Sequence, residues 1–440
     1  MLKNIIKQVW NQRRMNGWIL LELIIAGFFL WTVIDPVYIL MVNHFTPKGY
    51  EEENRFVLSM GAYGNNHAKR DSTVTQEQQK EAFLNAVRQL RECPEVESVC
   101  LVPNSSFPNG SSWSGTQFYA DTTQIEKKNY VHAQGYNYVS LEGGNIFKAY
   151  GMKNALTGED IIIPEDAETR GLCFVSEGFA KHMFGTIHVV GKKMISYDKQ
   201  EIEIGGVFKD YKHREFQPPY PLAIRIQNSM RVSAFMHYMY MPVFKLKEGV
   251  DSEAFIERFE KEVAPHLARA NFYYKTITSF KERRIEYAEL SGTYNVIRLK
   301  LALAGFTLLC IFLGMIGTFW VRCNARRQEV GLMKSFGATR SSIVSRFFTE
   351  SALLVSLAFI VSLIVLIHYA MEGNMTEIEV AGHPQFASIN WFLEEKPHFC
   401  MVSLITYLLL LSIALTGDEA LFQCTKPSGV PGGPSHLQFS

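Results

Sequence analysis

Four long apolar runs constrain this sequence more than any other feature. They cover residues 18–40, 301–321, 351–370 and 399–416, and the last three contain no Asp, Glu, Lys or Arg. A helix of roughly 20 apolar residues crosses the hydrocarbon core of a bilayer. A buried helix of a soluble protein could explain one such run, but four runs together predict four transmembrane helices.

The first run is the least regular, because it carries Glu22 and Asp35, the latter followed directly by Pro36. Glu22 lies four residues after Trp18, close to the expected membrane surface, where a carboxylate can reach water. We therefore expect Glu22 to be tolerated, and a proton site there is the lesser alternative. The run is too long for a cleaved signal peptide and lacks a small-x-small cleavage site, so it predicts an uncleaved anchor.

The charges between the runs predict the orientation. Residues 1–17 contain four Lys or Arg and no acid, residues 322–350 contain six Lys or Arg against two Glu, and residues 371–398 contain five Glu against one Lys. Because Lys and Arg collect on the cytoplasmic side of a membrane, both termini are expected in the cytoplasm. The membrane expected is the inner membrane of the cell. The large segment between the first two runs then lies outside. The overall net charge of +1 gives no support for nucleic acid as a partner.

The segment between the first two runs predicts a mixed α+β domain of two subdomains. Strands are expected at 55–60, 96–102, 201–208 and 232–244, with a bulge or bend at Gly205 and Gly206. Helices are expected from Thr75 to Cys93, over 176–185 and over 252–268. The charged segment 280–295 predicts a solvated helical stalk that runs straight into the second span.

Seven cysteines are present, and two of them could form a disulfide. Cys93 and Cys100 lie in the segment expected outside the cytoplasm, at a helix end and in the strand after it. Seven residues of separation do not fix the distance between two Cα atoms, so two ordinary core thiols are the favoured alternative. No Cys or His spacing typical of a metal site is present.

We find no sequence pattern of an enzyme. The segment from Gly185 to Lys193 superficially resembles a phosphate-binding loop, but five residues separate its glycines and Lys193 stands where Ser or Thr must bind magnesium. A turn between a helix and a strand explains it better. The chain therefore lacks a Walker A motif of its own, and no catalytic residue is assigned.

The segment between the second and third spans is the most informative part of the chain for function. Residues 326–338 read RRQEVGLMKSFGA, with Val330, Met333 and Phe336 at three-residue steps. This pattern predicts a short surface helix with one apolar edge, which Gly337 ends. A helix that merely lies on lipid would have the same composition, so composition alone leaves both interpretations open.

This segment is similar to the R-x-E-[IV]-G-[IL]-x-[KR]-x-x-G-A signature of the MacB/FtsX family of ABC transporter permeases. Weaker similarities to the MacB-type periplasmic core occur in the family's order at 145–152, 175–185 with Gly191 and Lys192, and 204–211. The signature residues are Arg327, Glu329, Val330, Gly331, Leu332, Lys334, Gly337 and Ala338.

The resemblance implies a four-span permease whose segment 326–338 is a coupling helix docked on a cytoplasmic ABC ATPase subunit. ATP is then bound by that partner, the chain needs no cofactor itself, and a second permease subunit completes a homodimer or heterodimer. ATP-driven motion would pass through the spans and the stalk to the periplasmic domain, for efflux or export of a peptide, drug or lipid-linked substrate. A periplasmic adaptor and an outer-membrane channel are further partners implied by the MacB type.

Two alternatives share this architecture: an FtsX-like regulator of a cell-wall hydrolase, and a LolC/LolE-like permease that releases lipoproteins. The large outer domain favours the MacB type over the first. The C-terminal segment departs from the family pattern, which is a short basic segment with a Pro-Ala-rich motif. Its Gly and Pro content predicts disorder. The expected division is an interfacial amphipathic helix (1–17), spans at 18–40, 299–321, 351–370 and 399–416, a periplasmic core with stalk (41–298), a coupling loop (322–350), a short periplasmic loop (371–398) and a disordered tail (417–440).

Overall fold

The computed structural model describes residues 13–103, 115–127, 129–139, 144–227, 240–371 and 396–424. They fall into two compact units. The membrane unit combines Met1–Met41 with Asn295–Ser440, and the globular unit is Val42–Tyr294. Each unit is described by itself.

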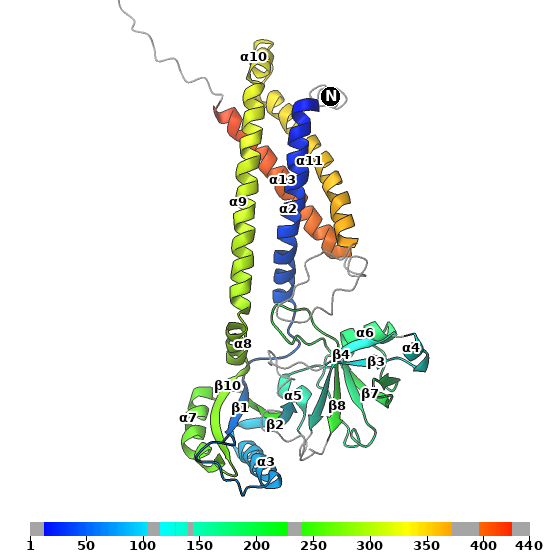
Figure 1. Cartoon of the computed structure of the whole chain (residues 1–440), viewed down its shortest axis with the longest axis vertical. Coiled ribbons are helices and arrows are strands. Elements are labelled where there is room, and N and C mark those ends of the chain that lie inside the picture. The colour runs from blue at the N-terminus through cyan, green and yellow to red at the C-terminus, as the bar shows by residue number, and fades with distance from the viewer. Residues whose placement is uncertain are drawn as a thin grey trace, which may run out of the picture. The chain divides into compact units, whose positions relative to one another are not determined.

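The membrane unit contains helices that are long and apolar enough to cross a membrane. Four such helices lie in the described part of the chain: α2 (Arg13–Phe45), α9 (Thr293–Ala325), α11 (Arg340–Met371) and α13 (Lys396–Cys424). Short helix α10 (Arg327–Ser335) connects α9 to α11 at one end of the bundle (Figure 1). The predicted fold class, four spanning helices with an α+β domain between the first and second, is confirmed.

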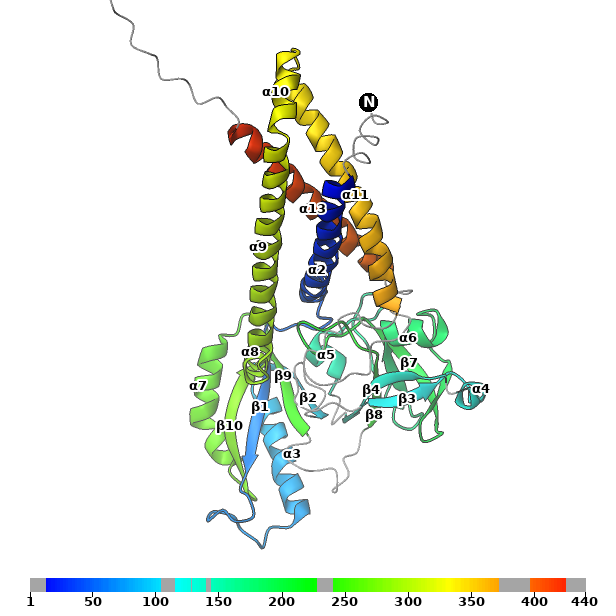
Figure 2. The same cartoon turned by 45° about the horizontal axis from the view of Figure 1, so that its top comes forward.

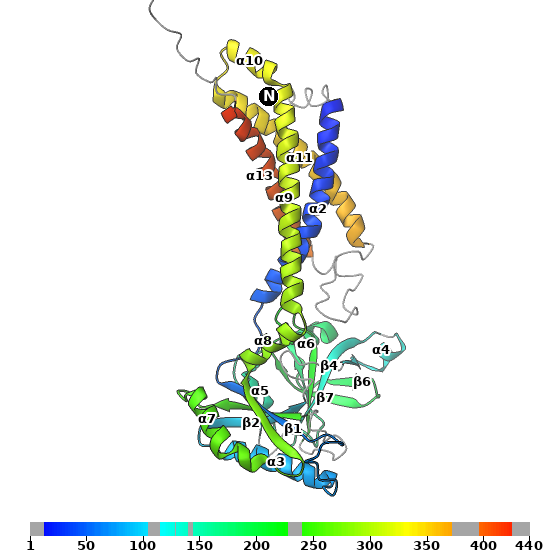
Figure 3. The same cartoon turned by 60° about the vertical axis from the view of Figure 1, so that its left-hand side comes forward.

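Helices α2, α11 and α13 form most of the core of the membrane unit, and α9, which runs beside them in Figure 3, contributes Met315. Leu23 of α2, Val355 of α11 and Leu410 of α13 are buried in one cluster. Gly27 allows close approach, because a Cβ atom there would lie 2.8 Å from Oγ of Ser362 on α11. Helix α9 has only 11% of its most apolar window buried, against 33% to 39% for the others. It therefore leaves a long apolar surface for lipid or for another protein chain.

The first part of the globular unit is an antiparallel sheet in the order β10-β1-β9-β2. Its strands are β1 (Arg55–Ala62), β2 (Val96–Pro103), β9 (Tyr240–Leu246) and β10 (Phe272–Ser279). Helices α3 (Gln76–Glu92) and α7 (Ser252–Glu262) cover one face, with η3 (Ala264–Leu267) after α7. Helix α5 (Ile146–Tyr150) covers the other face. Side chains alternate between the two cores, since Phe56 and Leu58 pack with α3 and α7 while Val57 packs with α5.

The second part closes on itself, because β8 pairs with both β5 and β4 (Figure 2). Its core contains Phe118, Met194 and Ile204, together with Phe179 of α6 (Glu177–Phe184). The two parts of the unit are joined through one pairing between Leu101 and Val139. The strands are β3 (Gly115–Tyr119), β4 (Val131–Val139), β5 (Cys173–Ser176), β6 (Lys193–Ser196), β7 (Glu201–Phe208) and β8 (Leu222–Gln227), with helix α4 (Thr122–Glu126) after β3.

Local signals in the sequence correctly predict several element ends. Thr75 caps α3 in a capping box with Gln78, and Ser176 caps α6, which ends at left-handed Gly185. The expected bulge in β7 is present, because the β5–β7 register passes from Ile204 to Gly206 and skips Gly205. The predicted helix over 252–268 is interrupted after Glu262, and residues 264–267 form η3 instead.

Other expectations need correction. The stalk helix α8 (Phe280–Leu290) does not run straight into the second span, because Gly292 adopts a left-handed φ of +68° before α9 begins. Helix α13 continues to Cys424, so the first part of the tail expected to be disordered is helical. That stretch, 418–424, contains neither Gly nor Pro. The interfacial helix expected over 1–17 falls mostly outside the described residues, and residues 13–17 already belong to α2.

The disulfide considered between Cys93 and Cys100 is not formed. Both are buried, free thiols. Cys93 ends α3 and packs on the face of the sheet that α3 covers, whereas Cys100 of β2 points to the opposite face, with Val102. Because side chains alternate along a strand, one strand position decides which core a residue joins. The favoured alternative of two core thiols is therefore correct.

Candidate functional site

Helix α10 is built from local signals in the segment that resembles the coupling signature. It runs from Arg327 to Ser335, and Gly337 follows in the left-handed conformation with φ of +83°. The N–H of Ala338 donates to the Met333 carbonyl at 3.0 Å, which closes the helix end. Thr339 Oγ1 then accepts from the Ser342 N–H at 3.3 Å and caps α11.

A buried arginine, Arg326, fixes α10 to the membrane unit. Its guanidinium donates to both carboxylate oxygens of Glu329, at 2.7 and 3.0 Å, and to Glu350 Oε2 of α11 at 2.6 Å. The guanidinium also lies over the Phe347 ring, 4.6 Å from its centroid. Arg346 of α11 approaches Glu329 Oε1 at 3.9 Å. We call Arg326, Glu329, Arg346, Phe347 and Glu350 the Arg326 cluster.

The central ion pair of the Arg326 cluster, between Arg326 and Glu350, has little contact with water. The side chains of Arg326 and Glu350 are 4% and 2% exposed. Burial alone would lower the pKa of Arg326, but its hydrogen bonds to Glu329 and Glu350 outweigh burial and raise that pKa. Removing one member of such a network leaves a buried charge without its partner. The free-energy cost of that change exceeds the net stabilisation that the intact network provides. The attachment of α10 to α11 therefore depends on Glu329.

Apolar side chains lie beside Glu329 on α10, at three- and seven-residue steps from it. Leu332 is 60% exposed and Phe336 is 83% exposed. A hollow of about 370 Å³ lies between α10 and α11. Its lining consists of Glu329, Leu332, Met333, Phe336, Ala338, Ser342, Ile343 and Arg346.

The predicted coupling residues differ in their surroundings. Glu329 belongs to the Arg326 cluster, Ala338 lines the hollow, and Val330 is half-buried. Leu332 and Lys334 are exposed, and Gly331 and Gly337 have open space where a Cβ would be. The side chain of Arg327 lies outside the described residues. Six of the predicted residues lie on α10, and Gly337 and Ala338 lie in the turn after it.

Sequence reasoning missed the partners of Glu329. Arg326 precedes it by three residues, a spacing at which helix side chains meet, so that contact had a local signal. Glu350 is separated from Arg326 by 24 positions. Its one signal was an acid placed directly before an apolar run, where a charge is costly unless it is paired.

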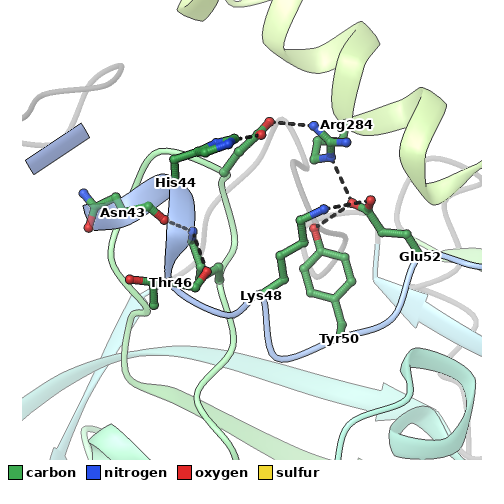
Figure 4. A network of polar contacts seen from close by, with 9 residues as sticks. Asn43, His44, Thr46, Lys48, Tyr50, Glu52 and Arg284 are labelled. Carbon is green, nitrogen blue, oxygen red and sulfur yellow. Dashed lines mark hydrogen bonds and ion pairs between the residues drawn. The ribbon is translucent and has the colours of Figure 1, made fainter. Parts of the chain in front are cut away.

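A second polar network lies in the globular unit, where the chain arrives from α2 and where α8 leaves for α9 (Figure 4). Arg284 of α8 donates to Glu52 at 2.9 Å and to Glu215 at 2.6 Å. Glu215 also pairs with His44 at 3.2 Å, and Lys48 pairs with Glu52 at 2.8 Å. These five residues form the Arg284 network. It ties the segments 44–52, 209–221 and 280–290 to one another.

Lysine 212 holds the end of α2 beside this network. Its ammonium donates to the carbonyls of Asn43 and, at 3.2 Å, Thr46. Carbonyls at a helix end have no partner within the helix, so a cation there satisfies them. Lys212 is 1% exposed, and burial lowers its pKa to about 8. Burial alone would raise the pKa of Glu52, but the hydrogen bonds from Lys48 and Arg284 together hold it below its usual value.

Comparison with known proteins identifies the membrane unit. Residues 301–416 match the family model described as the FtsX-like permease C-terminal domain. The membrane unit therefore contains an FtsX-like permease C-terminal domain. Residues 326–338 lie inside the matched region, which supports the resemblance to MacB/FtsX-like ABC transporter permeases. FtsX-like permeases of this type work with an ABC ATPase subunit.

The globular unit of the permease resembles solved structures only distantly. The periplasmic region of MacB from Actinobacillus actinomycetemcomitans is 13% identical, with a TM-score of 0.33 over 55% of this chain and 96% of that chain. The extracellular domain of the noncanonic ABC-type transporter YknZ from Gram-positive bacteria is 9% identical, with a TM-score of 0.31 over 50% of this chain and all of that chain. No curated protein matches the permease.

Proposed function

We propose that this permease transmits ATP-driven motion from cytoplasmic ATPase subunits, docked on α10, across the inner membrane to the globular unit. The globular unit would lie in the periplasm and both termini in the cytoplasm. The observation that carries the proposal is an exposed apolar pair, Leu332 and Phe336, beside a largely buried ion pair network that holds α10 to α11. The motion would drive efflux or export of a peptide, drug or lipid-linked substrate.

The contacts of α10 suit a part that receives force. An aromatic and a leucine side chain exposed together are typical of the anchors that bind a partner protein. The Arg326 cluster links α10 to Glu350 in the first part of α11. A displacement of α10 would therefore move α11 with it, because the network and the short turn at Gly337 leave little freedom between them.

The Arg284 network suits the receiving end. The chain passes between the two units twice, after α2 and before α9. Arg284 and Lys212 connect both of these segments to the loop 209–221. Movement of either chain segment would therefore be shared with the loop 209–221 through paired, largely buried charges.

Two copies of the permease, or this permease and a related one, would form the complete membrane part. The argument is the exposed apolar surface of α9, which contributes little to the core of its own unit. ATP would be bound by the partner ATPase. A periplasmic adaptor and an outer-membrane channel would serve as further partners in the MacB type of system.

Substitution on α10 tests ATPase docking. The Leu332→Ala and Phe336→Ala variants should each lose roughly tenfold or more in co-purification of the ATPase subunit, as expected for interface anchors. Ile360 on α11 is exposed to a similar fraction, 58% against 60% for Leu332, so Ile360→Ala is a matched control that should retain the ATPase. Equal retention of the ATPase by the Leu332→Ala, Phe336→Ala and Ile360→Ala variants would contradict the proposal.

Capture of partners with the globular unit tests the type of system. An adaptor protein would support MacB-type export. A cell-wall hydrolase or a lipoprotein carrier, captured in its place, would support the FtsX-like or LolC/LolE-like alternative and leave the role of α10 unchanged.

A further inference from the structure

An acid and a histidine meet inside the membrane unit, away from α10. His398 Nε2 lies 2.7 Å from Asp35 Oδ1, which joins α13 to α2. Asp35 is fully buried, and the side chain of His398 is 10% exposed. The ring of Tyr38 packs edge-on against the imidazole, with centroids 4.9 Å apart.

The surroundings of this pair are apolar. Trp31 of α2, Leu366 of α11, and Phe399 and Val402 of α13 form a buried cluster on the adjacent turns. Asp35 Oδ2 has no hydrogen bond partner among the described residues. Burial of an ionisable group inside a membrane bundle is costly and is usually connected with function. Helices α2 and α13 are already linked without an ionisable group, because Trp31 Nε1 donates to Ser403 Oγ at 3.2 Å.

The charge of the pair depends on how many protons it holds. With one exchangeable proton the pair is electrically neutral, either as carboxylate with imidazolium or as carboxylic acid with imidazole. A second proton leaves a net positive charge in an apolar interior, and loss of the first leaves a net negative charge. The contact between α2 and α13 is therefore most stable over the pH range in which the pair holds one proton.

We propose that Asp35 and His398 form a proton-binding site that holds α13 against α2 while it carries one proton. Asp35 lies six residues before Met41, where α2 leaves the membrane unit, and His398 lies in the first turn of α13. The site thus lies on the same helix that later reaches Asn43 and the Lys212 contact. This inference does not rest on ATPase docking by α10.

Few other titratable groups accompany the pair among the described residues. On α2, Tyr38 contacts the imidazole. On α11, Tyr369 packs against Phe28 and His368 is exposed. On α13, Cys400 is exposed. Histidine is the side chain that usually changes its charge near neutral pH. His368 and His398 must therefore be distinguished by substitution.

The test is the thermal unfolding of the purified full chain in detergent, measured from about pH 5 to about pH 8. The wild type should show a maximum in Tm within this range. The double variant Asp35→Asn with His398→Gln should lose that maximum, with a Tm lower by roughly 5 °C at the wild-type optimum. The exchanged pair, Asp35→His with His398→Asp, should restore it.

Two controls make the result specific. Ser403→Ala removes the non-titrating Trp31 contact, so it should lower Tm at every pH and keep the maximum. His368→Gln should leave the profile unchanged. An identical pH profile in the wild type and the double variant would overturn the proposal. If the double variant does not fold, nuclear magnetic resonance of ¹⁵N-histidine in the wild type, with the His398 signal assigned by His398→Gln, decides: titration of His398 supports the site and its absence overturns it.

Discussion

At the scale of single residues, two buried cations set the geometry of the regions proposed to move. Arg326 fixes α10 through two carboxylates, and Lys212 fixes the end of α2 through two carbonyls. In both cases the charge is far from water, so a substitution of a partner has a larger effect than the loss of one surface contact. Glu329 and Lys212 are therefore the residues at which the account is tested most sharply.

Glu329→Lys should release α10 from α11. The new ammonium would lie beside Arg326 and Arg346, and like charges would repel where an ion pair now exists. We expect loss of at least tenfold in ATPase co-purification and in ATPase activity stimulated by the permease, while membrane insertion is unchanged. Glu329→Gln, which keeps the shape and one acceptor, should show a smaller loss. An ATPase-stimulating activity of Glu329→Lys equal to that of the wild type would contradict the role of the cluster.

Lys212 predicts a specific pH dependence of stability. Its pKa falls from 10.5 in the unfolded chain to about 8 in the folded one, so the unfolded chain binds more protons between these values. Stability contributed by this group therefore rises with pH, by about 1 to 3 kcal/mol over the range from about 8 to 10.5. Other groups also make stability depend on pH in the alkaline range; burial raises the pKa of the Cys173 thiol, for example, to about 12. The quantity to measure is therefore the difference in stability between the wild type and a Lys212 variant. Chemical unfolding of wild type and Lys212→Met should give a free energy difference that changes with pH in this direction, and a constant difference would be inconsistent with it.

At the scale of elements, the sequence predicts a helix well where its end signals are local. The Thr75, Ser176 and Gly185 signals place α3 and α6 correctly, and Gly337 ends α10 as expected. The break between α8 and α9 was missed, because a charged helix followed by an apolar one reads as continuous and a single glycine inside it is weak evidence. The contacts of Arg284 join segments 69 and 232 residues apart, for which the sequence carries no pattern.

Gly337→Val should displace α10 from α11. Its φ of +83° is a conformation that L side chains rarely adopt, although a Cβ there would meet no atom within 4 Å. The strain therefore comes from the backbone and is about 1 to 2 kcal/mol or more for a β-branched residue. We expect reduced binding of the ATPase subunit with normal insertion. Gly331→Ala, within the helix and in open space, should retain full binding, and so should Gly337→Asn in large part.

Arg284→Met should destabilise the globular unit strongly. The side chains of Glu52 and Glu215, only 15% and 12% exposed, would then face each other without their shared cation. Loss of one partner from a buried pair costs about 3 to 5 kcal/mol, which hydrogen exchange of the segments 44–52 and 280–290 would report. Lys193→Met is the control, because Lys193 and Glu201 are more than half exposed and should contribute less than about 1 kcal/mol. Similar exchange rates in both variants would show that the network does not hold these segments.

At the scale of the whole molecule, hydrophobicity and the coupling signature were sufficient to predict the class. Four apolar runs, with a long α+β segment between the first and second, gave the correct architecture, because the bilayer admits few solutions for such a chain. The closed arrangement of β3 to β8 could not be predicted, since it depends on the parallel pairing of β4 with β8, which are distant in sequence. For the same reason Asp35 was only an irregularity in the first apolar run, and the fold alone pairs it with His398.

The central claim is that α10 and the globular unit lie on opposite sides of the membrane. Lys334 of α10 and Ile162 of the globular unit are both exposed, and Ile162 is 85% exposed, so each can carry a single cysteine in a variant lacking the native ones. A membrane-impermeant maleimide added to intact spheroplasts should label Ile162→Cys at once and Lys334→Cys only after the membrane is opened. Labelling of both positions before the membrane is opened, or of neither, would contradict the account.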